Sequence, residues 1–185
     1  MNFSIFKRKL KPLNINLLDL HKYKIVNELQ FQYEPIVLYG DEAFVLARKC
    51  VPAFYNKSDQ QILSMADGYF LYENLAEDFS NTGVVCIFKG TIGTLAHELC
   101  HAKQFQDRNK WMENKKWLKV FYKLGYGFYP TEREAFGYAA TYLKNSHNDK
   151  LASLYRLKFF TVILFNTRII WPIYFVSIIK WLYHL

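Results

Sequence analysis

The chain has 185 residues, 51% of them hydrophobic and 22% charged, which excludes a disordered chain and allows one domain with a terminal appendage. Its 24 lysines and arginines exceed its 16 acidic residues, and the resulting net charge of +8 suits an anionic partner without identifying one. Three cysteines without a CxxC pair exclude a disulfide scaffold and a thiolate zinc knuckle, and they favour a reducing compartment. The basic amino terminus lacks a following apolar run and does not predict a secretory signal. We therefore expect a cytoplasmic protein.

The first half of the chain predicts a helix over residues 17–32, ending before Pro35. A second helix is predicted over residues 41–50. Short apolar or aromatic runs bounded by Gly, Pro, Asn or Asp indicate strands. These strands are expected at residues 36–39, 51–55, 69–72 and 83–88.

The second half predicts helices, with a break at residues 125–130 and Thr131 as the N-cap of the helix that follows. Strands followed by helices indicate the α+β class. Three parts are expected: a basic helical segment over 1–35, the main domain over 36–145, and an apolar helical segment over 146–185.

The segment with the most specific chemistry contains the pattern HExxH. Residues four apart lie about 40° apart around a helix, so His97 and His101 share one face and can bind a single Zn²⁺. Glu98 lies beside the first ligand, where its carboxylate can take the proton of a zinc-bound water. The alternative is a helix with two surface histidines. Apolar neighbours favour burial and hence the metal site: Leu95, Ala96, Leu99 and Ala102.

The third ligand decides the subclass. In the elongated metzincin pattern it would be Asp107, but Gln104 stands where that pattern has glycine, and Asp107 then lies about 240° around the helix from His101. A carboxylate from a second helix is the alternative. Glu134 is the preferred candidate and Glu132 is its rival.

HELCH followed by EREAFGYA resembles the gluzincin metallopeptidases, in particular their small soluble forms and the ImmA/IrrE-type zinc domains. The resemblance covers about residues 51–145. It implies a zincin-like fold, a small twisted sheet with an HExxH active-site helix and a second ligand-bearing helix, here followed by apolar C-terminal helices. It also implies that Glu134 is the third zinc ligand and that the strand at 83–88 is an edge strand along the substrate cleft.

The chain departs from the family pattern at three positions. The family often carries Asp or Asn two or four residues after the ligand glutamate, where this chain has Phe136 and Tyr138. Lys103 stands where the family usually has an apolar residue. These differences concern the groups that orient the zinc ligands rather than the ligands themselves.

The expected function is a zinc metalloendopeptidase that cleaves a peptide or protein substrate with a water activated by Glu98. Tyr138, one turn beyond Glu134, is the first candidate for stabilising the oxyanion, and an ordinary core aromatic is its alternative role. Other candidates for that role are Tyr126, Tyr129 and His147. The alternative function is a zinc-fold protein with little or no proteolysis, acting as a regulator or as a structural component of a larger assembly.

The apolar stretch 159–185 is long enough to span a bilayer, but Arg168 near its middle would cost about 2.5–3.5 kcal/mol. We expect it to be covered by the catalytic domain, a partner chain or a membrane surface, so membrane association is an alternative to a purely cytoplasmic location. The basic and aromatic stretch 108–123 is interpreted as an amphipathic helix. Nucleic acid is not expected as a partner, because no helix-turn-helix or RNA-binding signature accompanies it.

Overall fold

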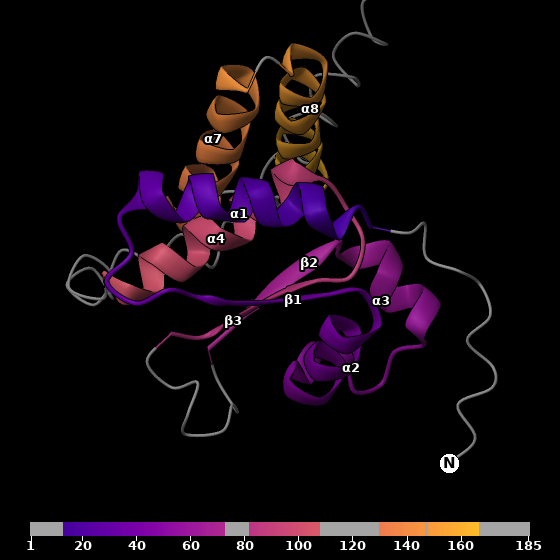
Figure 1. Ribbon diagram of the computed structural model, residues 1–185. Coiled ribbons are helices and arrows are strands. Elements are labelled where there is room, and N and C mark those ends of the chain that lie inside the picture. The colour runs from indigo at the N-terminus through magenta and orange to yellow at the C-terminus, as the bar shows by residue number, and fades with distance from the viewer. Residues whose placement is uncertain (1–12, 73–81, 108–129, 147, 167–185) are drawn as a thin grey trace, which may run out of the picture. The chain divides into compact units, whose positions relative to one another are not determined.

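The computed structural model describes residues 13–72, 82–107, 130–146 and 148–166 (Figure 1). Within these ranges the chain has six α-helices, one 3-10 helix and a three-stranded mixed sheet, which confirms the α+β class. The chain separates into two compact units, Met1–Asp107 and Arg108–Leu185. This division lies between the HExxH motif and the glutamate motif, whereas the sequence predicted boundaries at residues 35 and 145.

The first unit contains four α-helices, and local capping explains where two of them begin. Helix α1 (Ile15–Leu29) starts after Asn14, whose side chain accepts a hydrogen bond from the backbone N–H of Leu17. Helix α2 (Gly40–Cys50) follows strand β1 (Ile36–Tyr39) directly. Helix α3 (Asp59–Met65) begins with a reciprocal capping box between Ser58 and Gln61, a start signal that the sequence prediction did not use.

The strand predicted over residues 51–55 is wrong. Residues Pro52–Phe54 form a 3-10 helix instead. Pro52 cannot donate a backbone hydrogen bond to a neighbouring strand, and its fixed φ suits the first position of a helical turn. Two of the apolar side chains that suggested a strand, Val51 and Phe54, are nevertheless buried in the core.

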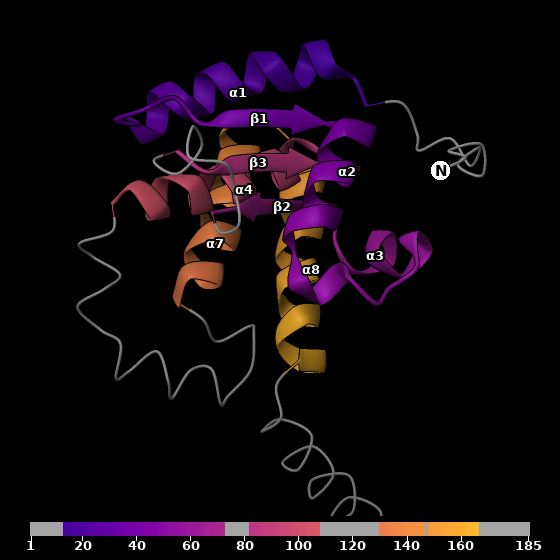
Figure 2. The same ribbon diagram turned by 90° about the horizontal axis from the view of Figure 1, so that it is seen from below.

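The sheet has the order β1-β3-β2, with β2 (Gly68–Leu71) antiparallel and β1 parallel to β3 (Val84–Ile87). Figure 2 shows β3 between its two neighbours. All four residues of β3 are buried. The expectation that this segment is an edge strand along a cleft is therefore wrong, and β1 and β2 are the edges of the described sheet. A fully apolar run is typical of a central strand, because both of its faces are covered.

Helices cover both faces of the sheet (Figure 1). Helix α4 (Ile92–Gln106) and α1 lie on one face, and α2 packs on the other. The core between α2 and the sheet is built around an edge-to-face contact of Phe44 with Phe88, whose ring centroids are 5.6 Å apart. The sheet thus presents α4 on a rigid apolar support.

Gly68 allows β2 to approach the first turn of α4. A Cβ atom at this position would lie 2.9 Å from the carbonyl oxygen of Cys86 and 3.1 Å from Cγ2 of Thr94. Both separations are shorter than ordinary van der Waals contact, so a larger residue would push β3 and α4 away. The glycine therefore helps to set how closely α4 lies on the sheet.

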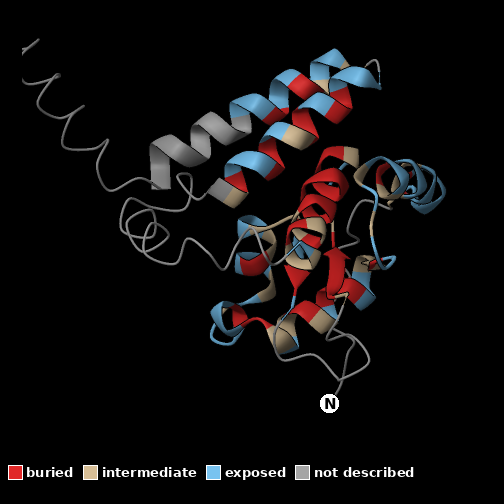
Figure 3. Ribbon diagram, turned by 90° about the vertical axis from the view of Figure 1, so that its left-hand side faces the viewer, coloured by how far each residue is buried: buried red, intermediate tan, exposed pale blue. Residues whose placement is uncertain are grey.

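The second unit contains α7 (Pro130–Asn145) and α8 (Asp149–Asn166), which pack against each other. Helix α7 begins one residue before the predicted cap Thr131, because proline is well suited to the first helical position. Phe136 contacts Tyr155 across the pair, with ring centroids 5.5 Å apart. Buried residues recur among exposed ones along α7 and over residues 149–157 of α8, as expected for amphipathic helices (Figure 3).

Two segments singled out in the sequence lie wholly or partly outside the described residues. Helix α8 includes the first part of the apolar stretch, 159–166, while 167–185 and the basic stretch 108–123 lie outside. Among the described helices, none combines the length and the hydropathy needed to cross a bilayer.

Candidate metal centre

Helix α4 is fixed at its N-terminus by a side-chain cap. The hydroxyl of Thr91 accepts a hydrogen bond from the backbone N–H of Gly93 at 3.2 Å, and the hydroxyl of Thr94 accepts one from the N–H of Thr91 at 3.4 Å. These bonds satisfy N–H groups that the first turn of a helix leaves without an intrahelical partner. The helix therefore has a defined start, with its N-cap residue six positions before its first histidine.

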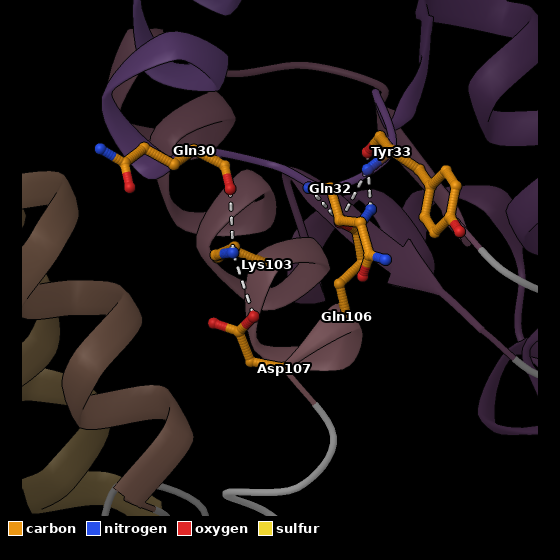
Figure 4. A network of polar contacts seen from close by, with 6 residues as sticks. All are labelled: Gln30, Gln32, Tyr33, Lys103, Gln106 and Asp107. Carbon is orange, nitrogen blue, oxygen red and sulfur yellow. Dashed lines mark hydrogen bonds and ion pairs between the residues drawn. The ribbon is translucent and has the colours of Figure 1, made fainter.

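Gln106 in the last turn ties α4 to the chain that leads from α1 into β1 (Figure 4). Its Oε1 accepts hydrogen bonds from the backbone N–H groups of Gln32 at 3.1 Å and Tyr33 at 3.3 Å. Its Nε2 donates to the carbonyl oxygen of Tyr33 at 2.7 Å. The side chain thus forms three bonds to a segment more than 70 positions earlier in the sequence.

Lys103 and Asp107 complete this end of the helix (Figure 4). The Lys103 Nζ donates to the carbonyl oxygen of Gln30 at 3.1 Å and lies 3.0 Å from a carboxylate oxygen of Asp107. Asp107 is the C-cap residue of α4. Its ion pair at the end of the helix supports the sequence argument that it is not the metzincin-type ligand.

His97 and His101 face each other on α4, which confirms that they share one face. Their Nε2 atoms are 3.1 Å apart, and their rings are nearly perpendicular, at 85°. Two imidazole nitrogens bound to one tetrahedral zinc at about 2.0–2.1 Å are about 3.3–3.4 Å apart. A displacement of a few tenths of an ångström would therefore convert this pair into two ligands of one ion.

Gln104 orients the second histidine. Its Oε1 lies 2.7 Å from Nδ1 of His101. An amide oxygen can only accept, so Nδ1 carries the hydrogen and Nε2 presents its lone pair toward His97. The sequence singled out Gln104 only as a residue that replaces glycine. Its spacing of three residues from His101 was the signal for this contact, since side chains at that spacing are neighbours on a helix.

Glu98, the predicted proton acceptor, is 9% exposed and lies in the same turn as His97. Its carboxylate is close enough to Cys86 on β3 to affect the thiol electrostatically. Burial first, and then the negative charge of Glu98, raise the pKa of Cys86 to about 12. Cys86 is therefore a neutral thiol at physiological pH and not a thiolate ligand. Cys100 is 4% exposed on α4, as expected for a small core residue.

The two candidate carboxylates of α7 differ in burial. Glu132 is 8% exposed, whereas Glu134 is exposed. Among the described residues, His97, His101 and Glu132 form a group that could hold a metal ion. Glu134, the preferred third ligand from the sequence, is not a member of that group.

Tyr138 is half-buried on α7, and its ring centroid is 6.2 Å from that of Tyr142. Its role toward an oxyanion stays a prediction. The other candidates for that role, Tyr126, Tyr129 and His147, lie outside the described residues.

Comparison of the chain with protein-family models, with curated proteins and with solved structures gives no match. The site itself is therefore the basis for an argument about function.

Proposed function

We propose that the chain is a zinc-dependent metallopeptidase of the gluzincin type, with a zincin-like fold, acting on a peptide or protein substrate. The observation that carries this proposal is the facing histidine pair of α4, in which His97 is buried and His101 is half-buried. The Nε2 atoms of His97 and His101 converge at 3.1 Å, and Glu98 lies between them in sequence. Two imidazoles and one carboxylate are a common ligand set of catalytic zinc sites.

The chemistry of the histidines fits a metal. His101 donates from Nδ1 to Gln104, which leaves its Nε2 free of a proton and able to bind a cation. The neighbouring side chains of α4 are largely apolar and buried, so few other groups compete with a metal for these nitrogens. Imidazole nitrogen with carboxylate oxygen suits zinc better than it suits calcium or magnesium.

We place the third ligand at Glu132. A carboxylate as buried as this one needs a cation or several hydrogen bonds to offset its desolvation. Its membership in the potential metal group supports this choice over Glu134. Glu134 remains the alternative that the family resemblance indicates.

In the proposed reaction, the bound zinc would supply Lewis acidity toward the substrate carbonyl and the attacking water. The Glu98 carboxylate accepts a proton from that water and delivers it to the departing amine. Its low exposure keeps competing bulk water away from this proton transfer. The Tyr138 hydroxyl is the candidate donor to the negative charge that develops on the carbonyl oxygen.

Metal analysis combined with a peptidase assay tests the proposal. The wild type and Glu98→Gln should each contain about one zinc per chain, because Glu98 is not a ligand. With a quenched fluorescent peptide library as substrate, Glu98→Gln should lose roughly 10²–10⁴-fold in rate. Glu28→Gln, an exposed glutamate of α1, is the matched control and should behave as wild type.

The outcomes separate the competing functions. Absence of bound zinc in the wild type would contradict the proposed metal centre. Stoichiometric zinc without hydrolysis of the library would favour the alternative, a zinc-fold regulator or structural component. Equal hydrolysis by wild type and Glu98→Gln would show that Glu98 is not the proton acceptor.

A further inference from the structure

We propose that Gln104 is a positioning residue that holds His101 in the tautomer and orientation required for metal binding. The observation is the 2.7 Å hydrogen bond between His101 Nδ1 and Gln104 Oε1 on α4. The inference rests on the metal centre of the proposed function, but it does not depend on proteolysis.

The direction of this hydrogen bond determines which ring nitrogen is available. A neutral imidazole carries one hydrogen, and the two tautomers of a histidine are close in energy in water. The Gln104 oxygen accepts from Nδ1 and therefore favours the form whose Nε2 carries a lone pair instead of a hydrogen. That Nε2 is the atom that lies 3.1 Å from Nε2 of His97.

Burial and rigidity make the bond effective. Gln104 is 5% exposed, so water does not readily replace it as the acceptor. Both partners are on one helix, which is capped at Thr91, and their backbones cannot move apart independently. Such support of a ligand histidine typically changes metal affinity by 10–100-fold.

Gln104 also accounts for a departure from the gluzincin pattern. The positions on α7 that often supply Asp or Asn hold Phe136 and Tyr138 here. Phe136 packs against Tyr155, which is a structural role within the α7–α8 pair. The acceptor for His101 comes instead from its own helix, three residues further along the chain.

The same helix provides a matched control. Gln106 is the same residue type, two positions away, and its amide bonds to the backbone of Gln32 and Tyr33 rather than to a histidine. Gln104→Met and Gln106→Met each replace an amide with an apolar side chain of similar length. Gln104→Glu keeps an acceptor oxygen for Nδ1–H and serves as the conservative rescue.

The first measurement uses the metal-free full-length protein. Nitrogen-15 NMR of the imidazoles should show His101 protonated at Nδ1 in the wild type, in Gln104→Glu and in Gln106→Met. In Gln104→Met the population protonated at Nε2 should rise, because the acceptor for Nδ1–H is gone. A purely structural role for Gln104 would leave the tautomer unchanged, and that result would overturn the proposal.

The second measurement is zinc affinity by competition with a chromophoric chelator. Gln104→Met should bind about 10–100-fold more weakly than wild type. Gln104→Glu and Gln106→Met should stay within a few fold of wild type. Wild-type affinity in Gln104→Met would refute the positioning role alone, whereas a wild type that binds no zinc would refute the proposed function and this inference together.

Discussion

Helices α4 and α7 both carry motif residues, yet they differ in how far their polar side chains are buried. Ten of the 15 residues of α4 are buried, and its buried polar residues are Thr94, His97, Glu98 and Gln104. On α7 the buried side chains are mostly apolar, and the adjacent Arg133 and Glu134 are exposed. Glu132 is the exception, a carboxylate buried in the first turn.

This difference shows that burial decides whether the contacts of a polar side chain are determined by the fold. Polar groups inside an apolar helix must find partners, because an unpartnered buried polar group costs about 1–3 kcal/mol. The pairs formed on α4, such as His101 with Gln104, are therefore determined by the fold. The exposed polar groups of α7 can be satisfied by water, so their identity constrains structure much less.

The largest expected effect comes from the support of α4. Leu99 is fully buried on this helix, and Leu99→Ala should lower the free energy of unfolding by about 2–5 kcal/mol, since it leaves a cavity. Leu154→Ala on α8 removes a leucine that is 52% exposed and should change the free energy of unfolding by no more than about 0.5 kcal/mol. Urea denaturation measures both values. Similar losses for the two variants would mean that burial does not distinguish these sites.

The two carboxylates of α7 provide the next test. Glu132→Gln should weaken zinc binding at least tenfold, because it removes a proposed anionic ligand. Glu134→Gln should stay close to wild type, since its side chain is exposed. Each variant is the control for the other when titrated against the same chelator. The reverse ranking would restore the assignment made from the family resemblance.

The smallest effect is expected at His21, a histidine of α1 outside the site. Partial burial first, and then the nearby positive charge of Lys24, lower the pKa of His21 below 6.5. The folded state then binds fewer protons than the unfolded state, so this residue's contribution to stability is lost as the pH falls below about 6.5. Unfolding by urea at pH 5 and pH 7.5 should show a smaller difference in His21→Gln than in wild type. An unchanged difference would mean that His21 does not contribute.

Much of the first unit could be predicted because its signals are local. The HExxH spacing predicted the facing histidines, and the sequence predicted the helical conformation that the structure shows at Ile92–Gln106. The run at 83–88 predicted a strand, seen at Val84–Ile87. Its central position depends on pairing with β1, far away in sequence, and with β2 on the other side. The fully apolar composition was the available signal, but the family resemblance pointed to an edge.

In the candidate site, too, local contacts could be predicted from the sequence, whereas features that depend on the rest of the fold could not. Gln104 was noticed as a residue that replaces glycine, and its hydrogen bond to His101 follows from spacing alone once the helix is accepted. The choice between Glu132 and Glu134 could not be made this way. Both lie in one turn of α7, and local pattern does not determine which side of a helix becomes buried.

The side-chain amide of Gln106 forms hydrogen bonds to the backbone that resemble those between neighbouring strands. With one oxygen and one nitrogen it bonds to two successive N–H groups and one carbonyl of residues 32 and 33, much as an adjacent backbone would. Residues 32 and 33 are therefore bound to the final turn of α4 just before β1 joins the sheet. Opening of the last turn of α4 would also expose these backbone N–H groups to solvent. We therefore expect the C-terminal end of the histidine helix and the segment that leads into β1 to open together.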